Sequence, residues 1–235
     1  MKKKTKPITT VVSFILDESG SMGSISNSVI TGFNEYVQGL KSQKGKILFT
    51  LTKFDTTAIN VAEYMKPVAE IEPLTPATYR QNAGTPLYDA VVQTIEKLVE
   101  DVKDNQPVIV AIMTDGEENS SQKHDQKCLR DLIQKLEKKG NWTFVFMGSN
   151  QDSWAVAQTI GISRGNTMDW QSTARGTSSI LRSAGQSTAF FAQEMGRRED
   201  LNSVLADAGE APVAMGTANF FAGSKDASVE AKVQE

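Results

Sequence analysis

The stretch VVSFILDESGSMGS, residues 11–24, places a carboxylate and two hydroxyls directly after an apolar, β-branched run. The run VVSFIL is typical of a buried strand in a parallel sheet. After it, Asp17, Ser19 and Ser21 stand at every second position. In an extended loop, residues with this spacing project to the same side of the chain. The stretch therefore predicts a strand end that presents three oxygen-bearing side chains together.

From this stretch to residue 161, apolar runs typical of strands alternate with segments whose apolar residues lie on one face of a helix. Strands are expected at residues 10–16, 44–54, 58–65, 107–116 and 141–150, and helices at 29–40, 87–102, 129–136 and 154–160. The helices are indicated by apolar residues spaced three and four apart. The connection DTTA between the second and third strands is short enough for an antiparallel hairpin. The remaining alternation predicts an α/β fold, with a mostly parallel sheet and helices on both of its faces.

Composition excludes several classes of function. The 235 residues carry 25 Lys and Arg against 28 Asp and Glu, a net charge of −3, so the basic field needed to bind nucleic acid is missing. Cys128 is the single cysteine, which excludes an internal disulfide and a cysteine zinc site. A serine hydrolase would need His124, the single histidine, as its base, and SGSMG lacks the first glycine of a nucleophile elbow. We expect no enzyme activity, with metal-assisted hydrolysis as the remaining alternative.

The N-terminus, MKKKTKP followed by ITTVVSFIL, resembles a secretory signal. The apolar run nevertheless ends at Asp17 without a small-residue cleavage pattern, and its β-branched residues favour a strand. No other stretch approaches the ~20 apolar residues of a membrane span. We therefore expect a cytoplasmic protein without a membrane partner.

Two further motifs offer oxygen ligands at comparable places. GTP, residues 84–86, puts Thr85 just before a helix, and MTDGEEN, residues 113–119, puts Asp115 at the end of a central strand. Each motif has a plain structural interpretation, as a helix N-cap followed by Pro86 or as a turn. Ligands of such sheets bind beyond the carboxyl ends of the strands, so the motifs together predict one site. Carboxylates and hydroxyls without imidazole or thiolate suit Mg²⁺, or Mn²⁺.

Together these motifs resemble the metal-ion-dependent adhesion site of von Willebrand factor type A domains. DESGSM is similar to the D-x-S-x-S signature of that family, GTPLYDA to its threonine loop and MTDGEEN to its strand-terminal aspartate. The resemblance covers roughly residues 8–161 and implies a doubly wound sheet with one antiparallel edge strand and a divalent cation at its top. It also implies that the metal is coordinated, in part through water, by Asp17, Ser19, Ser21, Thr85 and Asp115.

The chain is expected to have four parts. Residues 1–7 form a basic lead, 8–170 the von Willebrand factor type A domain, 171–199 a helical extension and 200–235 a flexible or loosely packed tail. The extension is indicated by its apolar residues, Ile180, Leu181, Phe190, Phe191 and Met195. From Asp200 onward Ala, Gly and Ser dominate and large apolar residues are sparse, which favours loose packing.

The resemblance favours a protein-binding module. A partner's Asp or Glu carboxylate would complete the coordination of the metal, and the protein would need no chemistry of its own. Glu18, Glu117 and Glu118 lie beside the ligands in sequence, where they either restrict the approach of partners or form a solvated acidic rim. The alternative is a structural or assembly protein. Its C-terminal extension would dock onto another chain, and the metal would only stabilise the protein. A ring ATPase or a second copy of this chain is a candidate partner.

Overall fold

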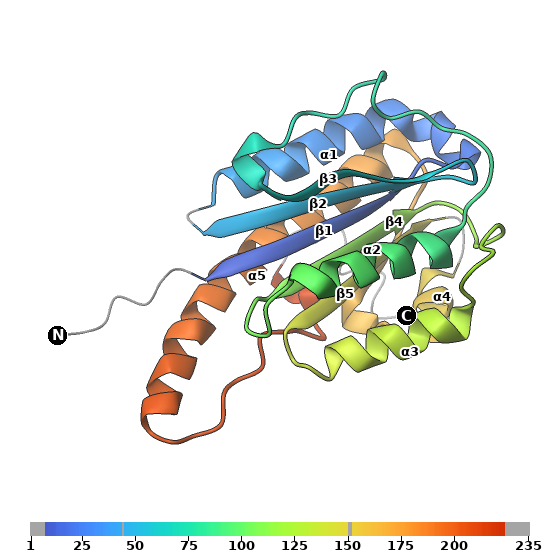
Figure 1. The fold of residues 1–235 in the computed structure, drawn as a ribbon. Helices are drawn as coiled ribbons and strands as arrows, with labels where there is room; N and C mark the ends of the chain where they lie inside the picture. Colours follow the sequence, from blue (N-terminus) through green and yellow to red (C-terminus); the bar gives the residue numbers. More distant parts are fainter. Residues whose placement is uncertain (1–7, 44, 150–151, 224–235) are drawn as a thin grey trace.

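A six-stranded sheet forms the middle layer of the molecule (Figure 1), in the order β3-β2-β1-β4-β5-β6. The structure, a computed structural model, describes residues 8–43, 45–149 and 152–223. The strands are β1 (Thr9–Asp17), β2 (Lys46–Phe54), β3 (Ile59–Pro67), β4 (Val108–Thr114), β5 (Trp142–Ser149) and β6 (Thr167–Trp170). All neighbouring strands run parallel except β2 and β3, and β3 lies at the edge. The expected doubly wound α/β sheet with one antiparallel edge strand is confirmed.

Helices cover both faces of the sheet. They are α1 (Ser26–Lys41), α2 (Leu87–Asp101), α3 (Gln126–Glu137), α4 (Ser153–Thr159) and α5 (Ala174–Asp207). Helices α1 and α5 pack on one face, and α2, α3 and α4 pack on the other (Figure 1). None of the helices in the described ranges is long and apolar enough to cross a membrane.

The two central strands, β1 and β4, are buried along almost their whole length. Alternate side chains of β1 enter opposite cores: Phe14 and Leu16 lie in the core under α1, and Val11 and Ile15 in the core under α2. A strand covered on both faces needs apolar side chains on both, which is why VVSFIL is a continuous apolar run rather than an alternating one.

Helix α5 crosses α1 at close range. A Cβ added at Gly32 of α1 would lie 2.6 Å from Cδ1 of Leu181 on α5, so the glycine makes room for that side chain. Further along the crossing, the buried hydroxyls of Tyr36 and Thr188 share a hydrogen bond of 3.0 Å. Because Gly32 has no side chain and the buried hydroxyls of Tyr36 and Thr188 bond to each other, α5 packs tightly against α1 although it carries few apolar residues.

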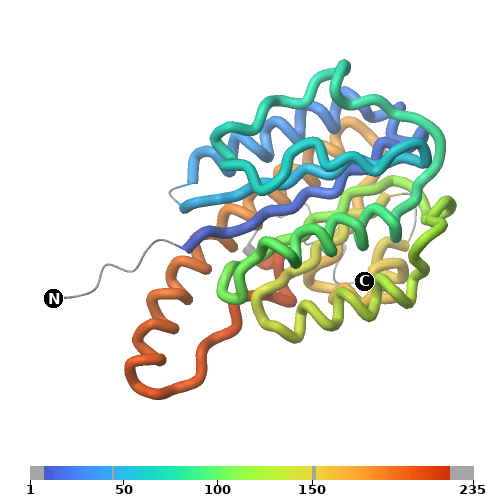
Figure 2. The backbone as a smooth tube through the Cα atoms, in the orientation of Figure 1, coloured from blue at the N-terminus to red at the C-terminus, as the bar shows by residue number. Residues whose placement is uncertain are grey.

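The segment from Asp200 onward differs from the loosely packed tail expected from its composition. Helix α5 continues to Asp207 and projects beyond the sheet, and the chain then returns to the body (Figure 2). On this return Met215 and Phe220 are buried, with exposed fractions of 7% and 3%. The backbone N–H of Met215 also donates to the carbonyl of Gly140 at 2.6 Å. The remainder of the expected tail, residues 224–235, and the basic lead, residues 1–7, lie outside the described residues.

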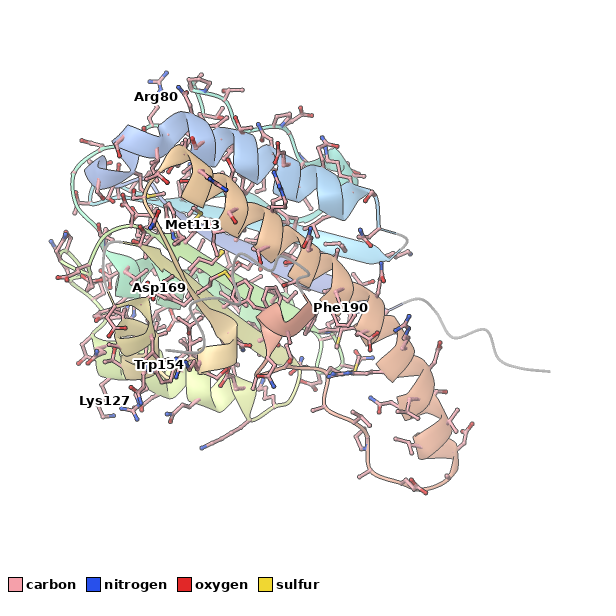
Figure 3. The ribbon with its side chains drawn as sticks, turned by 180° about the vertical axis from the view of Figure 1, so that it is seen from behind. Arg80, Met113, Lys127, Trp154, Asp169 and Phe190 are labelled. Carbon is pink, nitrogen blue, oxygen red and sulfur yellow. The ribbon has the colours of Figure 1, made fainter. Side chains whose placement is uncertain are left out.

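The sixth strand was not expected from the sequence. Strand β6 pairs in parallel with β5 and buries Met168 and Trp170. Figure 3 shows the face covered by α5, with Asp169 of β6 and Phe190 of α5 labelled. Because β6 ends at the same edge as β1 and β4, the loop that follows it reaches the end of the sheet where the predicted ligands lie.

Candidate metal centre

The two predicted carboxylates meet at the carboxyl edge of the sheet. Asp17 is the last residue of β1, and Asp115 follows Thr114, the last residue of β4. The two strands are direct neighbours in parallel register, with Leu16 beside Met113. Adjacent strands lie about 4.8 Å apart, so both strand ends deliver a carboxylate to one small volume. Their exposed fractions are 0% for Asp17 and 4% for Asp115.

Hydrogen bonds hold both oxygens of Asp17. Its Oδ1 accepts from the backbone N–H of Ser19 at 2.6 Å, and its Oδ2 accepts from the Thr114 hydroxyl at 2.6 Å. The pKa of Asp17 is raised to about 6, and burial is the main cause. The hydrogen bonds from Thr114 and Ser19 lower this pKa, and the nearby charge of Asp115 raises it by a smaller amount. Burial thus works against the ionised form of this carboxyl, and a nearby cation would favour it.

The alternating serines connect the two carboxylates. The hydroxyls of Ser19 and Ser21 lie 3.1 Å apart, and the Ser21 hydroxyl donates to Asp115 Oδ1 at 2.5 Å. Both serines lie where the chain leaves β1 and enters a short 3-10 turn, Gly20–Ile25. The two hydroxyls are thus brought together as expected, although Ser21 lies in this turn and not in the extended loop that the sequence predicted.

The loop before α2 brings Thr85 to the same place. Its backbone N–H donates to Asn119 Oδ1 at 2.9 Å, and the backbone N–H of Asn119 donates to the Thr85 carbonyl at 3.2 Å. Thr85 is not the N-cap of α2, because Pro86 takes that position. The interpretation of Thr85 as a helix N-cap therefore does not hold. Thr85 is buried at the edge of the sheet, with 2% of its surface exposed.

Gly116 marks the middle of the oxygen cluster. A Cβ added to this glycine would lie 3.0 Å from Thr85 Oγ1, 3.5 Å from Ser21 Oγ and 3.9 Å from Ser19 Oγ. Three hydroxyls from two separate loops therefore surround one point, next to a residue that has no side chain to fill it. The five predicted ligand residues are brought together by the fold.

The cluster contains two buried carboxylates, and a protein interior does not ordinarily tolerate such charges without compensation. Within the described ranges, neither Asp17 nor Asp115 forms an ion pair with Lys, Arg or His. Buried carboxylates are ordinarily paired or bound to a metal. The described residues contain no cluster of three His, Cys, Asp or Glu, so any ion here would depend on two carboxylates and three hydroxyls. Such hard oxygen donors fit Mg²⁺ or Mn²⁺.

Several residues that support the cluster were not found from the sequence. The Tyr79 hydroxyl donates to the backbone carbonyl of Asp17 at 2.8 Å, and the hydroxyl of Ser172 lies 3.3 Å from Asp115 Oδ2. Ser172 lies between β6 and α5, and finding it would have required the unexpected strand. Asn119 was visible as the end of MTDGEEN, three residues after Gly116, but its bond to the Thr85 loop has no sequence signal.

The neighbouring acidic residues largely serve the structure. Glu18 pairs with Lys53 at 3.0 Å. Glu118 Oε2 accepts from the backbone N–H of Tyr88 at 2.9 Å in the first turn of α2. His124 lies in the loop just before α3 and places Nδ1 3.0 Å from Asp89 Oδ1. It is therefore engaged with a carboxylate of α2 and not with the serines.

Comparison with known proteins supports the architecture. Neither a protein-family model nor a curated protein matches the sequence. Among solved structures, proximal thread matrix protein 1 from the mussel byssus is 13% identical, with a TM-score of 0.56 over 75% of this chain and 45% of that one. The pilus adhesin SpaC from Lactobacillus rhamnosus GG is 12% identical, with a TM-score of 0.58 over 80% and 31%. The SpRpn10 VWA domain is 12% identical, with a TM-score of 0.50 over 74% and 94%.

These comparisons concern the fold. At such low identity they show a shared architecture, and the chain has a von Willebrand factor type A-like α/β fold with an added long C-terminal helix. The chain spans about half the length of the mussel protein and less than a third of the adhesin's.

Proposed function

We propose that this chain is a protein-binding module that works through a bound divalent cation, as a metal-ion-dependent adhesion site. In this proposal Mg²⁺, or Mn²⁺, is held by Asp17, Ser19, Ser21, Thr85 and Asp115. The ion, when bound, offers a coordination position to a carboxylate from outside, and the side chain of an Asp or Glu of a partner protein completes it. The protein itself supplies position and charge and carries out no reaction.

The observation that carries the proposal is the pair of buried carboxylates without a cation. Asp17 and Asp115 lie at adjacent strand ends, 0% and 4% exposed, and no Lys, Arg or His of the described chain pairs with either. Structural carboxylates in such positions are costly unless their charge is compensated. The hydroxyls around Gly116 add neutral oxygen donors, which suit a hard divalent cation.

The absence of a reaction is part of the proposal. His124 is the only histidine of the sequence, and its ring is bonded to Asp89. Ser19 and Ser21 are bonded to one another, and Ser21 also to Asp115, and neither hydroxyl is bonded to an imidazole or an amine in the described residues. A byssus matrix protein and a pilus adhesin among the structures with this fold accord with a role in contacting other proteins.

Calorimetry tests the metal site. Chelator-stripped protein titrated with Mg²⁺ or Mn²⁺ is expected to show one divalent site, and Asp17→Ala is expected to remove it. The control is Asp104→Ala, the same change at an exposed residue in the loop between α2 and β4, at the opposite edge of the sheet. Thermal unfolding of both variants separates a lost ligand from a lost fold. Unchanged metal binding in a folded Asp17→Ala variant contradicts the assignment.

A second experiment separates this function from its alternative, constitutive assembly. The observation that favours assembly is the projecting end of α5, where Leu201 and Val204 are 46% and 64% exposed. Immobilised protein is incubated with candidate partners in Mg²⁺ or in EDTA. Capture that requires Mg²⁺ and is lost in Thr85→Ala supports the metal-dependent module. Capture that survives both changes, and is lost in a Leu201→Ser, Val204→Ser variant, supports assembly through the helix.

A further inference from the structure

An open groove of about 560 Å³ adjoins the candidate metal centre. Its lining includes Asp55, Ile59, Pro86, Asp89, Asn119 and Lys123. Pro86 directly follows Thr85, and Asn119 accepts the hydrogen bond from the Thr85 backbone N–H at 2.9 Å. The groove therefore begins at the residues that position one of the proposed ligands, and a chain segment that reaches the metal passes beside it.

Of the two carboxylates in this groove, Asp55 accepts fewer hydrogen bonds from the described residues than Asp89 does. It follows Phe54, the last residue of β2, which pairs with Asp17 of β1, so it lies one strand away from the metal centre on the same edge. Its Oδ1 accepts from the backbone N–H groups of Thr57 and Ala58, at 2.6 Å and 3.0 Å, and from the Thr57 hydroxyl at 2.5 Å. No described residue donates a hydrogen bond to its Oδ2, and although Asp55 is only 8% exposed, this oxygen is not closed off from solvent.

Asp89 adds a second carboxylate to the wall of the groove. It is 6% exposed and accepts hydrogen bonds from three successive backbone N–H groups, those of residues 122–124, and from the His124 ring. Burial raises its pKa, but these bonds together outweigh burial, so the pKa of Asp89 is lower than usual and the carboxyl stays ionised. The wall of the groove thus contains the negatively charged Asp89 carboxylate, which the backbone N–H groups of residues 122–124 hold in position.

No lysine or arginine of the described chain pairs with the two carboxylates of this wall. Lys123 also lines the groove, but its exposed side chain forms no ion pair with Asp55 or Asp89 in the described part of the chain. The remaining lining includes the apolar surfaces of Ile59 and Pro86. A long side chain with an aliphatic stem and a cationic head matches this combination, because the stem covers apolar surface and the head reaches the carboxylate.

We propose that the groove is a second subsite, which takes a Lys or Arg side chain from the same partner segment whose carboxylate reaches the metal. This inference rests on the proposed function, and it narrows the partner to a segment that carries an acidic and a basic residue close together. Asp17 and Asp55 lie at the ends of adjacent strands about 4.8 Å apart, and an extended segment advances about 3.3 Å per residue. The two residues of the partner are therefore expected about one to three positions apart.

A peptide selection tests the subsite without a known partner. A phage library of random linear dodecapeptides is selected on the immobilised full chain in Mg²⁺ and eluted first with EDTA and then with acid, so that metal-dependent and metal-independent binders are recovered separately. Enriched peptides are expected to contain Asp or Glu with Lys or Arg one to three residues away. The same selection on Asp55→Asn is expected to keep the acidic residue and lose the basic one. Asparagine retains Oδ1 as the acceptor for Thr57 and Ala58, so the turn at this position is preserved.

Binding of a selected synthetic peptide measures the contribution of the subsite. Asp55→Asn is expected to weaken binding about tenfold, the usual loss for a charge-assisted hydrogen bond. Replacing the basic residue of the peptide by norleucine should weaken binding to the wild type equally and to Asp55→Asn hardly at all. The control is Asp104→Asn, which makes the same charge change at the opposite edge of the sheet and should leave binding unchanged.

The outcomes separate the two proposals. Peptides enriched in acidic residues alone, or a basic preference that persists in Asp55→Asn, overturn the subsite and leave the metal-dependent module standing. A basic preference that requires Asp55 but neither Mg²⁺ nor an acidic residue supports a cation-binding groove and overturns its link to the metal, while calorimetry on Asp17→Ala decides the proposed function separately.

Discussion

Gly116 occupies the one position in the metal centre where a single added carbon can be placed among the proposed ligands. Its missing Cβ would lie 3.0 Å from Thr85 Oγ1 and 3.5 Å from Ser21 Oγ. Gly116→Ala is therefore expected to displace the Thr85 hydroxyl and to lower the affinity for Mg²⁺ about tenfold, as changes beside metal ligands commonly do. The measurement is calorimetric titration of folded, chelator-stripped protein. Equal affinity in the variant would show that the ion does not lie among these hydroxyls.

Residue-scale reasoning from the sequence succeeded where a side chain follows the end of a strand. The rule that parallel strands end at one edge was enough to bring Asp17 and Asp115 together. It failed where the neighbour depends on a loop path: Ser172 reaches Asp115 only because β6 ends there, and Tyr79 reaches the carbonyl of Asp17 across a long irregular connection. The path of such loops is decided by packing, which a single sequence does not display.

At the scale of elements, the crossing of α1 and α5 depends on the absence of a side chain at Gly32. A Cβ there would lie 2.6 Å from Leu181 Cδ1 and 3.1 Å from its Cβ, and Leu181 is fully buried. Gly32→Ala is expected to reduce the free energy of unfolding by about 1–3 kcal/mol through overpacking. Urea unfolding at constant pH measures the change.

The same helix offers a matched control for this substitution. Gly39 also lies in α1, but a Cβ added there would meet nothing within 4 Å. Gly39→Ala is therefore expected to stabilise the protein by up to about 1 kcal/mol, because alanine loses less backbone entropy in a helix. If the two alanine variants unfold at the same urea concentration, α5 does not pack against α1 as closely as described.

The elements differ in how far their sequences reveal them. Residues 107–116 form a near-continuous apolar run, which correctly predicted β4, and the short connection DTTA correctly predicted the antiparallel pair of β2 and β3. Strand β6 has only four residues, TMDW, too few for a periodic pattern to emerge. Helix α5 was expected within an extension of residues 171–199 but runs to Asp207, because no Gly or Pro interrupts its last turns.

At the scale of the whole molecule, the returning segment after α5 is part of the core. Phe220 is 3% exposed and contacts Phe191 of α5, with 6.4 Å between the ring centroids. Phe220→Ala is expected to reduce the free energy of unfolding by about 3–5 kcal/mol, as for other buried aromatic side chains. Phe190→Ala, at a side chain that is 48% exposed (Figure 3), should cost less than about 1 kcal/mol in the same urea titration.

This part of the chain also explains why composition misled the sequence interpretation. Met215 and Phe220 are isolated large residues in a segment of Ala, Gly and Ser, and a count of apolar residues gives them little weight. Their burial depends on the partners that the fold provides, namely the turn at Gly140 and helix α5. If Phe220→Ala proved as stable as Phe190→Ala, the segment would be the loose tail that its composition suggests.

The oxygen cluster draws on chain positions from Asp17 to Asp115, which the pairing of β1 with β4 and the loop before α2 bring together. The unfolded chain therefore has no equivalent of this cluster, and any ion that binds there binds the native state alone. Such a ligand shifts the folding equilibrium by mass action, adding about 2.7 kcal/mol of stability at a hundredfold excess over its dissociation constant. The temperature at which the chain unfolds would then report the concentration of free cation around it.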